Sequence, residues 1–263
     1  MDPFEISNLS VVLYMAITVG RVIDLNFEPF YIDMERRGIV LQDVSLKDMP
    51  QALRDGSVNA GPVSLVDSFA LEDVCNPVAG FCLAASNRSG SNLLYSKKPM
   101  DELSGGTIAT ATADSTTQRL FQVLLSEKHN GRAEPFVPMP EEHDAFVISG
   151  DDALRRRRGA RGYQHRYDLG EEWHAMTNLP FVFARWMARK ELDDQETLLV
   201  EDTLYVGLED GVDSLFHLAE PKDHLLMMAR DIVEYIIGYR YFVGLSERKS
   251  IDLFKEYLAN VKD

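Results

Sequence analysis

Segments that favour strands and segments that favour helices alternate along the first part of the chain. Three runs rich in β-branched or other apolar residues predict strands, over 17–25, 39–44 and 58–63. The segments between and after them predict helices, over 30–37, 45–55 and 64–71. Ser45 and Ser64 suit helix starts because a serine side chain can cap free N–H groups, and Gly56 suits a helix end. Such alternation with short connections is typical of an α/β sheet.

A second α/β unit begins near Lys97-Lys98-Pro99. Short apolar runs predict strands on both sides of this tripeptide, over 81–86, 91–96, 107–111, 136–138 and 145–148. Ser115 is placed to cap an amphipathic helix over 116–127. Leu179–Ala188 is a long apolar segment with aromatic residues and predicts a central strand. The remaining chain predicts only helices, over 195–209, 211–217, 221–237 and 246–261.

Extended segments near 93–99 and 180–188 bracket this second unit, which indicates one domain inserted into another. We therefore predict a first lobe from residues 1–98 together with 181–263, and an inserted second lobe from residues 99–180. Two lobes joined by two crossing strands leave a cleft between them, where ligands usually bind. Hinge closure on the ligand is the expected motion.

The N-terminal region does not have the character of a signal or an anchor. Leu9–Val19 is apolar, but the residues before it carry Asp2 and Glu5 and no basic residue. The run is also too short to span a bilayer. We expect a short extension that leads into a buried strand, in a soluble, cytoplasmic protein. The two cysteines, Cys75 and Cys82, have neither redox nor zinc spacing and are expected to be buried thiols in a reducing compartment.

The charge balance narrows the choice of ligand. The 263-residue chain carries 27 basic and 42 acidic residues, a formal net charge of −15. Because nucleic acids and anionic membranes bind mainly to Lys and Arg, neither is an expected partner. Six arginines between Arg155 and Arg166 run against this balance. They indicate either a solvated mobile loop or a rim that attracts anions.

Hydroxyl groups recur where predicted strands pass into helices. Ser115-Thr116-Thr117 and Ser64 both hold such places, where free N–H groups can bind an anion, although each is equally a simple helix cap. Ser89-Gly90-Ser91-Asn92 places small polar groups before a strand. Ser149-Gly150-Asp151-Asp152 follows a strand, as cleft residues often do, but it also suits a helix start.

Several common signatures are missing from the chain. No GxGxxG, GxxxxGK[ST], HExxH or GxSxG motif is present, and the six histidines have no metal-ligand spacing. His143 and His174 are the histidines nearest the expected cleft, and we expect both to be structural or exposed. The residues thus predict a two-lobed protein for a small carboxylate ligand, and they leave binding and catalysis open.

Six motifs, taken together, resemble the menaquinone-biosynthesis enzymes of the futalosine route, and most closely their chorismate dehydratase branch. The longest is Tyr167–Glu191, similar to that family's DLGEEW…TGLPFVFAxWxAR block. Shorter matches are Leu25–Pro29 (LNxxP), Ala60–Ser64 (xAPVSS), Ser91–Pro99 (SVxLxSxxP), Ser115–Thr117 (S-x-T) and Ile148–Leu154 (IGDxAL). They follow the family's order from about residue 17 to residue 258.

The resemblance implies a periplasmic-binding-protein-like (type II) α/β fold with two lobes. It implies dehydration of chorismate, a dicarboxylate, to 3-[(1-carboxyvinyl)oxy]benzoate, with no metal or organic cofactor. By motif, Asn26 and Ser91 would be catalytic, with Asp151 as a further acid–base candidate. Asn26 would orient the leaving hydroxyl or the enolpyruvyl group, and the substrate's own enolpyruvyl carboxylate is a candidate base. The implied substrate-binding residues are Ser64, Asn92, Ser115, Thr116 and Gly150.

Two other functions stay open at this point. A sister enzyme on the same fold, 1,4-dihydroxy-6-naphthoate synthase, typically has a histidine where this chain has Asp151. A non-catalytic protein that binds small carboxylates is the other alternative. The chain also departs from the family pattern, because Asp24 stands where an aromatic residue is usual, and Asn59 and Leu65 replace an aspartate and a serine.

Overall fold

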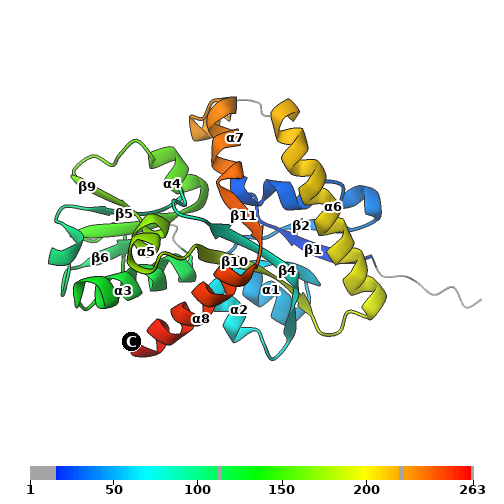
Figure 1. The fold of residues 1–263 in the computed structure, drawn as a ribbon, viewed down its shortest axis with the longest axis horizontal. Coiled ribbons are helices and arrows are strands. Elements are labelled where there is room, and N and C mark those ends of the chain that lie inside the picture. The colour runs from blue at the N-terminus through cyan, green and yellow to red at the C-terminus, as the bar shows by residue number, and fades with distance from the viewer. Residues whose placement is uncertain (1–15, 112–113, 219–221, 262–263) are drawn as a thin grey trace, which may run out of the picture.

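The chain forms two β-sheets, each covered by helices (Figure 1). The structure, a computed structural model, describes residues 16–111, 114–218 and 222–261. The first sheet has the strand order β11-β4-β10-β3-β1-β2. Its strands are β1 (Thr18–Arg21), β2 (Val40–Asp43), β3 (Ala60–Ser64), β4 (Cys75–Ala85), β10 (Phe181–Arg189) and β11 (Tyr239–Phe242). We call this sheet and its helices the first lobe.

The second sheet has the order β7-β6-β8-β5-β9. Its strands are β5 (Asn92–Ser96), β6 (Ile108–Thr110), β7 (Val137–Pro138), β8 (Ala145–Ser149) and β9 (His165–Asp168). This sheet and its helices are the second lobe. The chain crosses from the first sheet between β4 and β5, and it returns between β9 and β10 through helix α5 (Leu169–Thr177). The strand β5 pairs with β8 and β9, so it belongs to the second sheet although the predicted boundary followed residue 98. The domain limits themselves stay a prediction.

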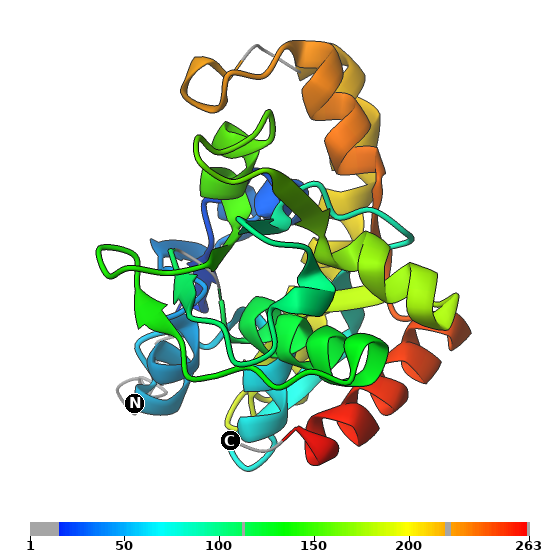
Figure 2. The same ribbon diagram turned by 90° about the vertical axis from the view of Figure 1, so that its left-hand side faces the viewer.

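The central strand predicted at Leu179–Ala188 is confirmed. The strand β10 runs antiparallel to both β3 and β4, and its residues Phe181–Met187 are nearly all buried. At its start Phe181 packs against Trp173 of α5 and Phe254 of α8 (Leu245–Asn260). Helix α8 also contacts α3 (Ser115–His129), so the C-terminal helix lies against the second lobe as well as the first (Figure 2).

Among the other helices, those near the predicted segments 45–55, 64–71, 195–217 and 221–237 have shifted ends, and the helix over 150–156 had only been an alternative. They are α1 (Met49–Asp55), α2 (Leu65–Ala70), α4 (Gly150–Arg156), α6 (Asp194–Leu218) and α7 (Ala229–Ile237), with the 3-10 helices η1 (Leu25–Tyr31), η2 (Glu35–Arg37), η3 (Met100–Glu102) and η4 (Asp223–Leu225). Asp114, and not Ser115, caps α3 by accepting a hydrogen bond from the N–H of Thr117. The helix predicted over 30–37 is wrong. Two short 3-10 helices take its place, with Pro29 inside the first.

Two errors near the C-terminus have clear physical reasons. The break predicted between two helices at Gly211 is absent, and α6 runs through it. A Cβ at Gly207 would lie 2.9 Å from the carbonyl oxygen of Ile32, so glycine here allows α6 to approach η1 closely. The strand β11 lies between the helices predicted over 221–237 and 246–261, where no strand was predicted. Its alternation of buried Tyr239 and Tyr241 with exposed neighbours is a strand pattern.

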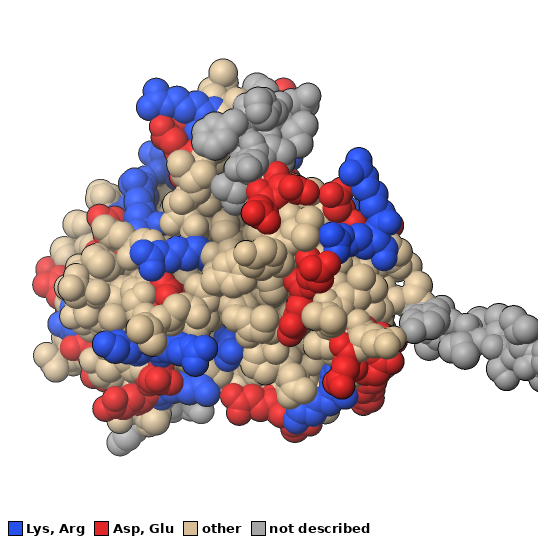
Figure 3. Space-filling view, turned by 45° about the vertical axis from the view of Figure 1, so that its right-hand side comes forward, with Lys and Arg blue, Asp and Glu red and all other residues tan. Residues whose placement is uncertain are grey.

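The structure also bears on the predictions for the cysteines and for membrane spans. Cys75 and Cys82 are buried free thiols, as expected. Most of Leu9–Val19 lies outside the described residues. In the part of this segment that is described, Ile17 and Val19 are buried. In the described part of the chain, no helix is both long and apolar enough to cross a membrane. The face shown in Figure 3 carries acidic and basic side chains interspersed.

Candidate active site

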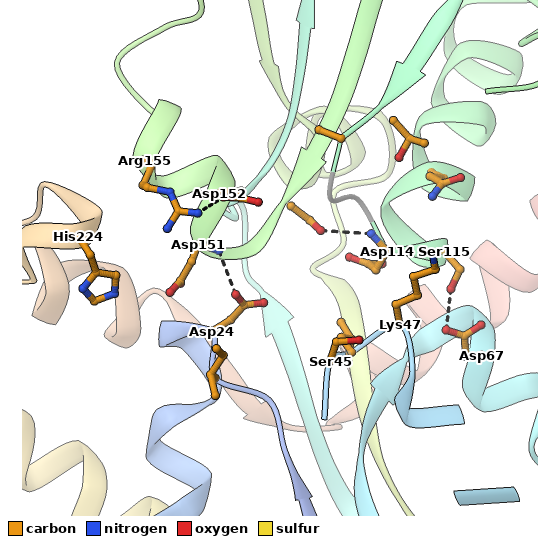
Figure 4. Close-up of a pocket in the computed structure, with 16 residues that line it drawn as sticks. Asp24, Ser45, Lys47, Asp67, Asp114, Ser115, Asp151, Asp152, Arg155 and His224 are labelled. Carbon is orange, nitrogen blue, oxygen red and sulfur yellow. Dashed lines mark hydrogen bonds and ion pairs between the residues drawn. The ribbon is translucent and has the colours of Figure 1, made fainter. Parts of the chain in front are cut away.

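A cavity of about 880 Å³ lies between the two lobes and is lined by residues of both (Figure 4). The first lobe contributes Ile23, Asp24, Ser45, Leu46, Lys47, Asp67 and His224. The second contributes Thr110, Ala111, Asp114, Ser115, Gln118, Ser149, Asp151, Asp152 and Arg155. The volume is in the range of small-molecule sites. The cleft predicted between the lobes therefore exists, and it is rich in carboxylates.

Asp67 joins the two lobes at one end of the cavity. Ser64 ends β3 and caps α2, so its hydroxyl reaches Asp67 in the first turn of that helix, with 2.7 Å between Ser64 Oγ and Asp67 Oδ2. Ser115 begins α3 in the other lobe, and its hydroxyl donates to the same Asp67 oxygen at 2.8 Å. The two serine oxygens are 2.6 Å apart. Beside them, Thr116 Oγ1 accepts a hydrogen bond from the N–H of Val66.

This arrangement bears on the predicted carboxylate ligands. Ser64 and Ser115 have one proton each, and both protons are used within the cluster with Asp67. In this state the two serines offer only lone pairs to a ligand. The sequence reasoning missed Asp67, although Ser64 followed three residues later by an acid is the spacing of a capping box. The roles predicted for Ser64, Ser115 and Thr116 stay predictions.

Asp24 and Asp151 meet at the other end of the cavity. Asp151 donates its N–H to Asp24 Oδ1 at 3.2 Å, and Leu25 donates its N–H to Asp151 Oδ1 at 3.0 Å. Burial, reinforced by the negative charge of Asp151, raises the pKa of Asp24 to about 6. Burial also raises the pKa of Asp151. Both carboxyls therefore hold a proton more readily than an exposed aspartate does.

Cations stand beside these carboxylates. Arg155 lines the same end of the cavity, where it pairs with Asp152. His224 of η4 lines this end of the cavity too. Lys47 lines the opposite end, near Ser115 and Asp67 (Figure 4). His224 was missed, because the sequence analysis placed only His143 and His174 near the cleft. Neither of these lines the cavity, and their ring nitrogens bond Tyr163 and the Leu179 carbonyl instead.

Ser91 lies in a buried cluster of hydroxyl groups. Tyr235 Oη donates to Ser91 Oγ at 2.6 Å, and Tyr239 Oη lies 3.0 Å from the same oxygen. Because Tyr239 uses its only proton on the Ser89 carbonyl, Ser91 donates to Tyr239 and keeps one lone pair. Burial raises the pKa of Tyr239 to about 12, and hydrogen bonding by Ser91 and by the neighbouring Asn26 acts against that shift.

Asn26 and Ser91 therefore both contact the hydroxyl group of Tyr239. The side chain of Asn26 is 4% exposed, and its Oδ1 has no hydrogen-bond partner among the described residues. A buried amide oxygen without a partner is costly, and such atoms often meet a ligand. Gly150 links this cluster to the cavity, because its N–H donates to the Ser91 carbonyl at 2.9 Å while Asp24 lies against its Cα. The structure therefore brings Asn26, Ser91, Gly150 and Asp151 together.

A comparison with known proteins gives the family. A family model described as menaquinone biosynthesis matches residues 17–260. The chain belongs to this menaquinone biosynthesis family. A curated chorismate dehydratase of Thermus thermophilus is 23% identical over 253 residues, which cover 89% of this chain and 92% of that protein.

Solved structures confirm the predicted fold of this menaquinone biosynthesis protein. Protein AF1704 of Archaeoglobus fulgidus matches with a TM-score of 0.66 at 13% identity, over 93% of this chain and 97% of that one. The alkanesulfonate-binding protein SsuA of Xanthomonas axonopodis pv. citri matches with a TM-score of 0.63 at 13% identity, over 94% of each chain. The fold is therefore periplasmic-binding-protein-like, with two α/β lobes.

Hydrogen bonds hold two parts of the predicted site of this menaquinone biosynthesis protein in place: Asp168 holds the segment before Ser91, and Thr117 holds Asn92. Asp168 caps α5 and also accepts hydrogen bonds from Ser89 and Gly90, which lead into Ser91. The sequence analysis used Asp168 only as part of the longest motif, and neither the helix that it caps nor its link to Ser91 was predicted. Asn92, a predicted ligand, is 4% exposed, and its Oδ1 accepts from Thr117 at 2.7 Å.

Part of the arginine-rich segment is held in place by α4 and by hydrogen bonds. Arg155 and Arg156 belong to α4, and Arg155 lines the cavity, which fits the predicted anion-attracting rim. Arg157 donates to the carbonyl oxygens of Leu225 and Leu226, so it fastens the η4 segment of the first lobe over α4. In the part of the chain that the structure describes, no three His, Cys, Asp or Glu side chains gather as a metal site requires.

Proposed function

We propose that this protein dehydrates chorismate to 3-[(1-carboxyvinyl)oxy]benzoate, as a carbon–oxygen lyase of the futalosine route in the cytoplasm. The observation that carries the proposal is the buried Oδ1 of Asn26, which has no partner among the residues that the structure describes and lies beside the tyrosine that also bonds Ser91. The menaquinone biosynthesis family and the chorismate dehydratase relative support it. Both residues also belong to motifs that resemble the dehydratase branch.

Dehydration of chorismate mainly requires that its reacting groups be held in the right positions. Chorismate carries a proton at C3 and a hydroxyl at C4, and losing both as water makes the ring aromatic. Asn26 Oδ1 and the free lone pair of Ser91 are acceptors, which suits them to hold and orient the C4 hydroxyl. The C3 proton passes to a carboxylate, for which Asp151 and the substrate's enolpyruvyl group are the candidates. A hydrogen bond to the ring carboxylate would stabilise the charge that develops.

The two carboxylates of the substrate need cations or N–H groups in an otherwise acidic cavity. Lys47 and Arg155 stand at opposite ends of it (Figure 4). A dicarboxylate that spans the cavity would meet one cation at each end. This pairing fits chorismate better than a ligand with a single carboxylate.

The test is to mix the purified protein with chorismate and to follow the aromatic product by ultraviolet absorbance and mass spectrometry. Turnover by the wild type and loss of most turnover in Asn26→Ala, with an unchanged melting temperature, would support the proposal. Asn76→Ala is the matched control, because Asn76 is exposed on β4. Near-normal turnover by Asn26→Ala would reject the residue assignment.

Two other results would replace the proposed function. Tight binding of chorismate without turnover would indicate a binding protein. Turnover of cyclic dehypoxanthine futalosine, and not of chorismate, would indicate the sister synthase.

A further inference from the structure

Asp24 lines the cavity beside Asp151. It follows β1 and stands two residues before Asn26, and its carboxyl lies in the cavity beside Asp151 (Figure 4). One of its oxygens accepts the N–H of Asp151 at 3.2 Å. In the described part of the chain, no Lys, Arg or His nitrogen lies within 4 Å of this carboxyl, and the nearby Arg155 is paired with Asp152.

The opposite lobe is shaped to receive this carboxyl. Gly150 has a φ of +66°, which favours glycine, and a Cβ placed there would lie 2.5 Å from Asp24 Oδ2. The N–H of Gly150 also donates to the carbonyl of Ser91. Asp24 therefore lies against Gly150, which is bonded to the backbone of Ser91, and it stands two residues before Asn26 in the chain.

We infer that Asp24 is a catalytic acid that protonates the C4 hydroxyl as this group leaves. The inference rests on the proposed dehydration of chorismate. The C4–O bond breaks with its electron pair on oxygen, and the proton of Asp24 converts the departing group to water. The C3–H electron pair forms the new ring double bond, and the C3 proton goes to the separate carboxylate base. Solvent then returns a proton to Asp24 and takes one from the base.

The electrostatic surroundings suit an acid. Burial and the charges of Asp151 and Asp114 favour the protonated carboxyl, and the charge of Arg155 opposes them. His224 faces the same end of the cavity. With its pKa at about 6, Asp24 keeps a proton in a useful fraction of molecules near neutral pH, which an exposed aspartate does not.

The experiment compares Asp24→Asn with the wild type in chorismate dehydration. The amide still accepts the Asp151 N–H but supplies no acid, so we expect kcat to fall about 100-fold or more with KM changed only a few-fold. The wild-type kcat should fall as pH rises above about 6, and Asp24→Asn should lose this limb. Asp24→Glu, which keeps an acid on a longer arm, should retain part of kcat and the falling limb.

The control is Asp43→Asn, which removes an exposed carboxylate that is paired with Arg21 outside the cavity. It should leave kcat and the pH profile unchanged. Turnover by Asp24→Asn within about three-fold of wild type, or an unchanged falling limb in that variant, would overturn this inference alone. No turnover of chorismate by the wild type would overturn the proposed function and this inference together. Chorismate affinity and melting temperature, measured on every variant, separate a lost acid from a lost fold.

Discussion

The hydroxyl oxygens of Ser64 and Ser115 lie 2.6 Å apart, although one belongs to each lobe, and both are hydrogen-bonded to Asp67. The carboxylate of Asp67 therefore occupies the place between two helix starts where a carboxylate ligand was expected. It holds the two lobes together and uses the protons that the ligand would need. Substrate carboxylate and Asp67 would compete for the same two hydroxyl groups.

Replacing Asp67 by alanine should tighten the binding of chorismate. Without Asp67 one serine can donate to the other, the second serine proton becomes available to the ligand, and one negative charge leaves the cavity, so we expect a 5- to 10-fold lower Kd, or about 1 kcal/mol. Isothermal titration calorimetry measures this. Asp55→Ala is the control, because Asp55 is exposed, bonds the N–H of Ser57 and does not line the cavity. Weaker binding in Asp67→Ala would instead make Asp67 a ligand of the substrate.

Asp24 should make the protein less stable as pH rises from about 4 to about 6. The folded protein keeps the Asp24 proton up to a pKa of about 6, whereas an unfolded aspartate releases it near 3.8. Stability is therefore lost through this window and stays lost above it. Asp24→Asn removes the loss and should raise the free energy of unfolding at pH 7.5 by about 1 to 2 kcal/mol relative to its effect at pH 4. Urea unfolding at the two pH values tests this, and equal effects at both would contradict it.

Removing Asp168 should disturb both stability and turnover. Its carboxylate accepts from the N–H groups of Ser89 and Gly90 and caps α5, so Asp168→Ala leaves buried donors without partners. We expect a loss of about 2 to 4 kcal/mol in the free energy of unfolding, and a lower kcat because Ser91 loses its support. Asp193→Ala, which removes an exposed carboxylate at the start of α6, should cost about 1 kcal/mol or less and leave kcat unchanged. A wild-type kcat in folded Asp168→Ala would show that Ser91 does not depend on Asp168.

Arg157 should control the mobility of the segment that carries His224. Its guanidinium binds the carbonyl oxygens of Leu225 and Leu226. Arg157→Ala should therefore speed amide hydrogen exchange over residues 222–228 by several-fold. The neighbouring Arg158 is exposed, so Arg158→Ala provides the matched control. Equal exchange in the two variants would mean that other contacts hold this segment.

Local patterns in the sequence determined much of the fold. The cap at Ser64 and the buried run of β10 each depend on neighbouring residues, and both were predicted correctly, as was the alternation of strands and helices apart from the helix over 30–37. The motifs likewise named Asn26, Ser91 and the segment 150–151, which the structure brings together. The short strand β11, between two predicted helices, was not predicted, because it forms by pairing with β4, which is far away along the chain.

Only the tertiary structure decided which of these residues meet. Asp24 and Asp151 are 127 residues apart in the chain, and Ser115 and Asp67 are 48 apart. The contact of each pair across the cavity follows from how the two lobes close. Such contacts set pKa values, use up hydroxyl protons and leave Asn26 Oδ1 without a partner among the described residues. Composition and periodicity report the surroundings of a residue along the chain, whereas its charge state and hydrogen bonds depend on neighbours that folding brings from far away.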